Sequence, residues 1–228
     1  MQSLSLFPVA SALFALALGL PVVMCAVLVR ERRRVLGEIR TSAGEHSWSF
    51  SVKRAFRDPA EFAIRGETFG GLPWHLRTSQ TRHDQDCKLR LELTFPTLGG
   101  ECNLAVVPRD PKLNSAMAHR GLEELREAAT GVPDFDAAFK ILVLSRQTSA
   151  SPLQAAIAAR FLSWPRNTVT PRSVAAWRDD SGCHLEAQLP AMANWATIEY
   201  LVALGEDFCA TLPAPSFFNS SWHKPQLA

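Results

Sequence analysis

The sequence predicts an α+β fold, an antiparallel sheet with packed helices, preceded by one N-terminal transmembrane helix. Three observations indicate this class. The first 29 residues are mostly apolar and contain no charged side chain. Several later segments alternate apolar and polar residues, as half-buried strands do. Paired strands come first, and helices interleaved with further strands follow them without a run of βαβ units, which is an order typical of an α+β domain.

The N-terminal apolar run, residues 6–29, is long enough to span a bilayer. Its 24 residues extend about 36 Å as a helix, and a hydrocarbon core is about 30 Å thick. The run is apolar on all faces, unlike a helix that packs one stripe against a core. It is too long, and lacks the preceding basic residues, for a cleaved signal peptide. Met24 directly before Cys25 also argues against a lipoprotein signal.

Basic residues follow this run and are absent before it. The positive-inside rule therefore predicts a single-pass protein of the inner (cytoplasmic) membrane with its C-terminal domain in the cytoplasm. The lipid bilayer is the first expected partner, because arginines near the surface attract anionic headgroups. The candidate membrane-interface residues are Arg30, Arg32, Arg33 and Arg34, with Arg40 nearby.

The chain divides into three parts by composition. Residues 1–34 form the transmembrane helix and basic juxtamembrane segment, residues 45–212 a soluble α+β domain, and residues 213–228 a flexible tail rich in proline and aromatic residues. Residues 35–46 are expected to be a linker. Exposed aromatics in a flexible tail can dock into a partner's groove. The candidate partner contacts are Phe217, Phe218 and Trp222.

The first half of the domain is predicted to be mostly strands. Alternation of apolar and polar residues is clearest at residues 89–95. Gly70-Gly71 indicates a turn, and the polar residues 78–86 a loop. The expected strands are residues 48–53, 62–65, 72–76, 89–95 and 102–107.

Helices enter in the second half of the domain. A helix is expected from Asn114 or Ser115 to Glu127, ended by Gly131-Val132-Pro133. Arg178 to Gly182 indicates a hairpin turn between strands 174–177 and 183–187. The other expected elements are a strand at 139–144, a helix opened by Ser151-Pro152, and a long last helix at 192–211.

Two polar clusters are candidates for metal or acid chemistry. His83, Asp84, Asp86 and Cys87 are the densest group of potential ligands, although a polar loop has the same composition. Asp134 and Asp136 could share a proton or bind a cation. The favoured alternative is that Phe135 enters the core while these acids cap the next segment and face water.

No catalytic residue, cofactor site or metal site is predicted. Cys183 and His184 are neighbours in a strand, so their side chains point to opposite faces and cannot act together. The chain lacks a nucleophile elbow, a phosphate-binding loop, a dinucleotide loop and the zinc protease motif. The cysteines lack zinc-site spacing. A net charge of +2 without a basic stripe excludes nucleic acid as a partner.

Two short patterns resemble uncharacterised bacterial single-span membrane-anchored proteins that contain a domain of unknown function. The patterns are Phe62-x-Ile64-x-Gly66-x-x-x-Gly70-Gly71-x-x-Trp74 and Thr130-Gly131-x-x-Asp134-Phe135-Asp136-x-x-Phe139. The second is similar to the G-D-x-x-F-D segment of those proteins, with Val132 where aspartate is frequent. The resemblance implies no assigned activity and transfers no functional residue.

These observations predict a membrane-anchored, cytoplasm-facing domain that interacts with a protein or with the membrane surface, and that is more plausibly not an enzyme. Two alternatives remain: an enzyme acting on a lipid or membrane-associated substrate, and a small-ligand sensor domain. A deep pocket holding His75, His83 or His184 beside a carboxylate or a cysteine would favour the enzyme.

Overall fold

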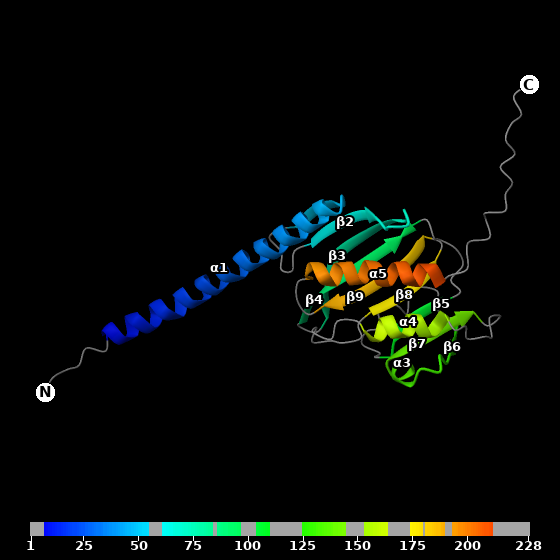
Figure 1. The fold of residues 1–228 in the computed structure, drawn as a ribbon. Helices are drawn as coiled ribbons and strands as arrows, with labels where there is room; N and C mark the ends of the chain where they lie inside the picture. The colour runs from blue at the N-terminus through cyan, green and yellow to red at the C-terminus, as the bar shows by residue number, and fades with distance from the viewer. Residues whose placement is uncertain are drawn as a thin grey trace, which may run out of the picture.

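The protein consists of a long N-terminal helix that ends on a sheet covered by helices on one face (Figure 1). This architecture comes from a computed structural model that describes residues 7–54, 61–83, 86–96, 104–109, 125–144, 153–163, 174–179, 181–189 and 193–211; of residues 7–18, 54, 80–83, 86–88, 144, 153–157 and 211 it describes the backbone alone. Structural statements below concern these residues. The predicted tail, residues 213–228, lies outside them, as do Asp84 and the residues 114–124 of the first predicted helix.

Helix α1 runs without a break from Phe7 to Glu45. The prediction of a linker at residues 35–46 is therefore wrong. Ile39 and Ala43 are fully buried against the domain, and Val35 and Leu36 pack beside them. This spacing of three and four residues gives the end of the helix an apolar stripe, which binds it to the domain. Within the part of the chain whose side chains are described, no helix combines the length and apolar character needed to cross a bilayer.

The strands form one sheet of nine, in the order β1-β2-β3-β4-β9-β8-β5-β7-β6. Each pairing is antiparallel, which confirms the α+β class. The strands are β1 (Ser49–Arg54), β2 (Glu61–Glu67), β3 (Pro73–His83), β4 (Asp86–Phe95), β5 (Leu104–Pro108), β6 (Leu125–Ala128), β7 (Phe139–Leu144), β8 (Val174–Asp179) and β9 (Gly182–Leu189). The other helices are α3 (Pro133–Ala138), α4 (Leu153–Leu162) and α5 (Trp195–Thr211).

The described part of the predicted loop at residues 78–86, namely residues 78–83 and Asp86, lies in two long strands. β3 continues to His83 and β4 begins at Asp86, with Arg82 opposite Cys87. Thr78 is buried, yet its hydroxyl is satisfied, because it accepts from the Phe62 N–H at 2.7 Å and donates to the Phe62 carbonyl at 3.1 Å. Polar residues are compatible with a strand when such bonds are made.

The prediction of a helix that ends at Glu127 is also wrong for residues 125–127, the part of it that the structure describes. Residues 125–128 form the edge strand β6, which pairs with β7. Gly131-Val132-Pro133 begins helix α3 instead of ending one. Proline is favoured in the first helical turn, and the φ of +76° at Gly131 suits a glycine. The same residues therefore signal either end of a helix.

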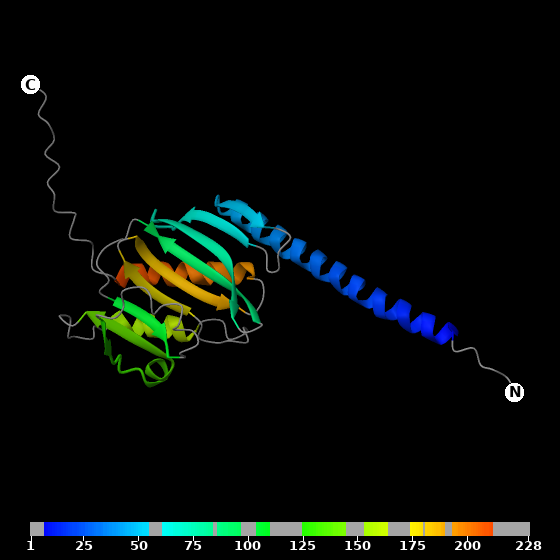
Figure 2. The ribbon, with the colours of Figure 1, turned by 180° about the vertical axis from the view of Figure 1, so that it is seen from behind.

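The main core lies between one face of the sheet and the helices. Side chains from α1, α3, α4 and α5 meet the apolar residues of the strands in one cluster. Gly205 brings α5 close to β4, since an added Cβ would lie 2.6 Å from the Phe95 ring. The opposite face has a smaller apolar cluster around Trp177 on β5, β6 and β8. Over β1–β4 and β9 no described helix covers this opposite face (Figure 2), which we call the open face.

Candidate functional site

The open face carries polar side chains aligned across five strands. Antiparallel register places Arg65 opposite His75, and His75 opposite Thr94. The first row across the strands is Ser49, Arg65, His75, Thr94 and His184, and the second is Ser51, Ala63, Arg77, Glu92 and Glu186. Directly opposite side chains in a sheet lie about 5 Å apart at Cβ. Residues far apart in the sequence thus form one surface.

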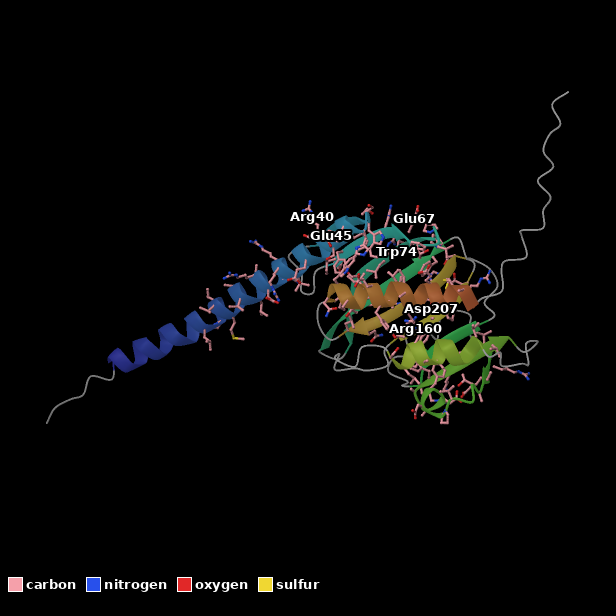
Figure 3. All side chains as sticks on the ribbon, in the orientation of Figure 1. Arg40, Glu45, Glu67, Trp74, Arg160 and Asp207 are labelled. Carbon is pink, nitrogen blue, oxygen red and sulfur yellow. The ribbon has the colours of Figure 1, made fainter. Side chains whose placement is uncertain are left out.

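Two clefts adjoin on this surface and share four residues. One has a volume of about 780 Å³ and the other about 340 Å³. The smaller cleft adds Ser51 and Lys53 from β1, while the larger extends to the strand ends at Trp48, Glu67 and Trp74. Figure 3 shows Glu67 and Trp74 beyond the C-terminal end of α1, on the side away from the N-terminus. We call the combined site the basic cleft; its polar residues are Ser49, Ser51, Lys53, Arg65, His75 and Arg77.

The charges of the basic cleft are not neutralised by neighbouring acids. Arg65 and Arg77 are exposed, and neither has an ion-pair partner among the described residues. Glu92 lies opposite Arg77 in register, but its carboxylate forms an ion pair with Arg90 instead. Arg90 Nε lies 3.0 Å from Glu92 Oε1, although the two atoms are not aligned for a hydrogen bond. The Arg90 Nη2 also donates to Glu186 Oε2 at 2.6 Å. The acids of the second row are therefore engaged away from the cleft.

His75 lies between the two arginines of the cleft. Burial lowers the pKa of His75 below its ordinary value of 6.5, and Arg77, Arg65 and His184 lower it further, while Glu92 opposes them. The imidazole is therefore neutral at pH 7. It can accept or donate one hydrogen bond there, and a bound anion would favour its protonation.

Aromatic rings pack together on the core side of the sheet, at the end of the larger cleft. Trp48 meets Trp74 edge to face, with ring centroids 4.7 Å apart, and the His46 ring lies 4.8 Å from Trp48. Trp48 sits directly on Gly66, where a Cβ would come within 2.5 Å of Trp48 Cδ1. Trp74 is 2 % exposed, and its Nε1 has no hydrogen-bond partner among the described residues. This indole N–H is a buried donor on the core face of β3, because Trp74 alternates with the outward-facing His75.

Gly66→Ala is expected to displace Trp48 and to lower the free energy of unfolding by about 1–3 kcal/mol, the usual effect of overpacking. Urea unfolding followed by circular dichroism measures the change. Gly70→Ala is the matched control, because its added Cβ meets nothing closer than the Thr68 hydroxyl at 3.7 Å. Equal unfolding free energies for the two variants would show that Trp48 does not need the open space at Gly66.

A second cluster joins a histidine, an aspartate and a serine at the β8–β9 turn. His184 Nε2 lies 2.9 Å from both Ser181 Oγ and Asp179 Oδ1, and its Nδ1 lies 3.2 Å from Thr94 Oγ1. A catalytic triad needs its carboxylate and its hydroxyl on different ring nitrogens. Here both groups contact the same nitrogen. The pocket at His184, about 190 Å³, is also small.

Asp179 instead fastens the hairpin. It accepts hydrogen bonds from the Ser181 N–H at 2.8 Å and from Trp177 Nε1 at 3.2 Å. Burial by itself would raise the pKa of Asp179, but the bonds from Ser181 and the nearby His184 outweigh it, so the pKa lies below its ordinary value of 3.8. Cys183, the other neighbour of His184, lies on the opposite face in the core, as the strand pattern predicted. Burial and Cys209 raise the pKa of its thiol far above the ordinary value, so the thiol is unreactive.

The depressed pKa of Asp179 predicts a specific loss of stability in acid. The ionised carboxylate stabilises the fold fully above the pKa of the unfolded chain, and this contribution is lost as the pH falls through the lower folded value. We therefore expect the difference in unfolding free energy between the wild type and Asp179→Asn to shrink below about pH 4. Urea unfolding across this pH range measures the difference. Asp134→Asn, on an exposed side chain, should show no such trend, and a constant difference for Asp179→Asn would contradict the prediction.

The structure separates the residues that the sequence singled out. Arg30, Arg32, Arg33 and Arg34 all lie on α1, where Arg32 is half-buried and Arg34 pairs with Glu31 and Glu38. Phe217, Phe218 and Trp222 lie outside the described residues, as do the side chains of His83, Asp86 and Cys87. Among the side chains that are described, no group of three metal-ligating residues occurs.

The preferred interpretation of Asp134-Phe135-Asp136 is supported for Phe135 and for the exposure of Asp134, whereas α3 has no side-chain cap hydrogen bond. Phe135 is fully buried, whereas Asp134 is exposed. Asp136 accepts hydrogen bonds from the Thr130 and Gly131 N–H groups, so it orders the loop that leads into α3. Sequence reasoning missed Arg65 and Arg77. Their alternation with buried apolar residues marked them as outward-facing, but only the strand register reveals that they share a cleft.

Comparison with protein-family models and with curated proteins gives no match. Among solved structures, the chain is similar to the crystal structure of the mycobacterial trehalose monomycolate transport factor A, TtfA, with a TM-score of 0.47 and 10 % sequence identity. The similarity covers 80 % of this chain and 98 % of that chain. A likeness of this degree supports no inference about the present protein.

Proposed function

We propose that the chain is a single-pass protein of the inner (cytoplasmic) membrane, in which α1 anchors a cytoplasmic interaction domain. The observation that carries the proposal is the exposed apolar surface of α1. Seven large apolar side chains are 46–68 % exposed: Leu20, Val22, Val23, Met24, Val27, Leu28 and Val29. Such a surface is unfavourable in water and favourable in lipid. The proposed span, residues 6–29, also includes residues 6–18, which are uncharged in sequence.

The length of α1 supports a protein partner over the bilayer surface. From Arg30 to Glu45 the helix rises about 22 Å, and it is continuous over this stretch. With the arginines at the headgroups, the domain would begin near Val35 and Leu36, and the end of α1 at Glu45 would lie about 22 Å from Arg30. The open face would then meet partners in the cytoplasm. The mixed hydroxyl, guanidinium and imidazole groups of this face suit hydrogen bonding to a polar partner.

Membrane fractionation tests the proposal. The full-length chain should remain in the pellet after carbonate washing and ultracentrifugation, and a variant lacking residues 1–29 should move to the supernatant.

A reporter fused after Ala228 tests the orientation and should be active in the cytoplasm. Replacing Arg30, Arg32, Arg33 and Arg34 by alanine should weaken this orientation. Recovery of the full-length chain in the aqueous fraction would overturn the anchor.

The small-ligand sensor is the second candidate, and the basic cleft favours it. The cleft has the volume of a small-molecule site, which is typically about 300–1,000 Å³. The enzyme alternative has less support, because the arrangement around His184 fastens a turn and does not form a nucleophile and base.

A further inference from the structure

We propose that the basic cleft binds the anionic group, a phosphate or a carboxylate, of a soluble ligand. The proposal rests on the proposed function in one respect, because both take the open face as the interaction surface. Its other evidence comes from residues of the domain, so it can be tested whether or not α1 enters a membrane.

The first argument is the concentration of positive charge. Lys53, Arg65 and Arg77 line one cleft of about 340 Å³ together with His75. The cleft is built from three adjacent strands, with Arg65 opposite His75 and Arg77 opposite Ala63. Bringing like charges together on one sheet face is destabilising without counter-charge. A bound anion would supply it.

The second argument is that nearby acids do not supply this counter-charge. Glu92 is held by Arg90, and Glu186 is paired with the same guanidinium. Glu67, at the rim of the larger cleft, is exposed and forms no ion pair with Arg65 or Arg77 in the described part of the chain. The two arginines therefore face the cleft with their donors available. Guanidinium groups bind phosphates and carboxylates through two parallel hydrogen bonds.

The third argument is a hydroxyl group beside the cations. Ser51 lies on β1 in the same cleft as Lys53, Arg65 and Arg77. Its hydroxyl can donate a hydrogen bond to a bound anion. This donor and the cations therefore belong to the same site.

The position of the cleft favours a soluble ligand over a lipid headgroup. Trp74 and Glu67 lie past the C-terminal end of α1, on the side away from the N-terminus (Figure 3). If α1 is anchored, the end of the helix beside the cleft lies about 22 Å along its axis from Arg30 and about 16 Å from Arg34. Lipid phosphates level with these arginines would lie that far from the cleft.

The test uses the full chain in nonionic detergent with pyrophosphate and citrate as probes. Calorimetry should detect binding of at least one probe, and Arg65→Gln with Arg77→Gln should weaken it at least about tenfold. Proton NMR of His75 supplies a readout that a structural role would not move: the probe should raise the pKa of this imidazole, which faces Arg65, Arg77, Glu92 and His184. Arg126→Gln, on an exposed arginine of β6 at the far edge of the sheet, is the matched control.

Three outcomes would overturn the proposal. The first is no binding of either probe by the folded wild-type chain. The second is an equal loss of affinity in the Arg126 control, which would indicate general attraction to surface charge. The third concerns the pKa of His75 in two titrations. If this pKa rises when the chain is placed in phosphatidylglycerol nanodiscs without a probe, and does not rise when pyrophosphate or citrate is added in detergent, the cleft binds lipid headgroups.

Discussion

Arg90→Met is expected to lower the free energy of unfolding by about 3–5 kcal/mol, the effect of removing one partner of a buried ion pair. Arg90 Nη2 donates to Glu186 Oε2 at 2.6 Å, and the side chain of Glu186 is only 4 % exposed. Without the guanidinium, the carboxylate keeps its desolvation penalty and loses its main counter-charge. Chemical unfolding in urea measures the loss.

The double variant Arg90→Met with Glu186→Met separates the pair from its packing. Replacing both charges by apolar groups is commonly near neutral, so the double variant should recover most of the lost stability. Arg126→Met, at an exposed position on β6, should stay within about 0.5 kcal/mol of the wild type. If the double variant is as unstable as Arg90→Met, the effect comes from lost side-chain packing and the ion-pair explanation fails.

Phe135→Ala should also lower the free energy of unfolding by about 3–5 kcal/mol, because it leaves a cavity in the core. Phe135 is fully buried and stacks on Phe139 with ring centroids 5.1 Å apart. Its ring also meets the edge of Phe161 on α4, with centroids 6.4 Å apart. The side chain thus joins α3 to both β7 and α4. Thermal and urea unfolding measure the change.

The flanking acid supplies the control for this variant. Asp134 is adjacent in sequence but exposed, so Asp134→Ala should change the free energy of unfolding by less than about 0.5 kcal/mol. A small effect of Phe135→Ala would mean that α3 is not held by this ring. A large effect of Asp134→Ala would instead revive the hypothesis that the acids of this segment form a site.

Local alternation was a reliable guide to the strands. In residues 89–95 every second side chain is apolar, and these side chains are the ones buried in β4. The hairpin turn at Arg178 to Gly182 was also predicted from its turn residues. In the structure, Asp179 accepts a hydrogen bond from the Ser181 N–H, and Gly182 has a φ of +146°. Patterns with a period of two and turn residues act over a few residues, so the sequence reports them directly.

The errors occurred where distant contacts override local composition. Residues 78–86 look like a loop, yet residues 78–83 belong to β3 and pair with β4, which begins at Asp86, and the Thr78 hydroxyl bonds the backbone of Phe62. Residues 125–128 look helical, yet β7 takes them as an edge strand. Residues 35–45 look like a linker, yet Ile39 and Ala43 find a core to pack against. Tertiary contacts of this kind override weak local preferences.

By itself the sequence determined the α+β class, most of the strands, the last helix and the charge step between the apolar run and Arg30, because each depends on neighbours in the chain. Only the tertiary structure decided that Arg65 and Arg77 share a cleft with His75, that Trp48 rests on Gly66, and that Arg90 is paired with Glu186. Such contacts follow from which strands pair and in what register. Alternation specifies the face a side chain occupies, but it does not specify the neighbour across the sheet.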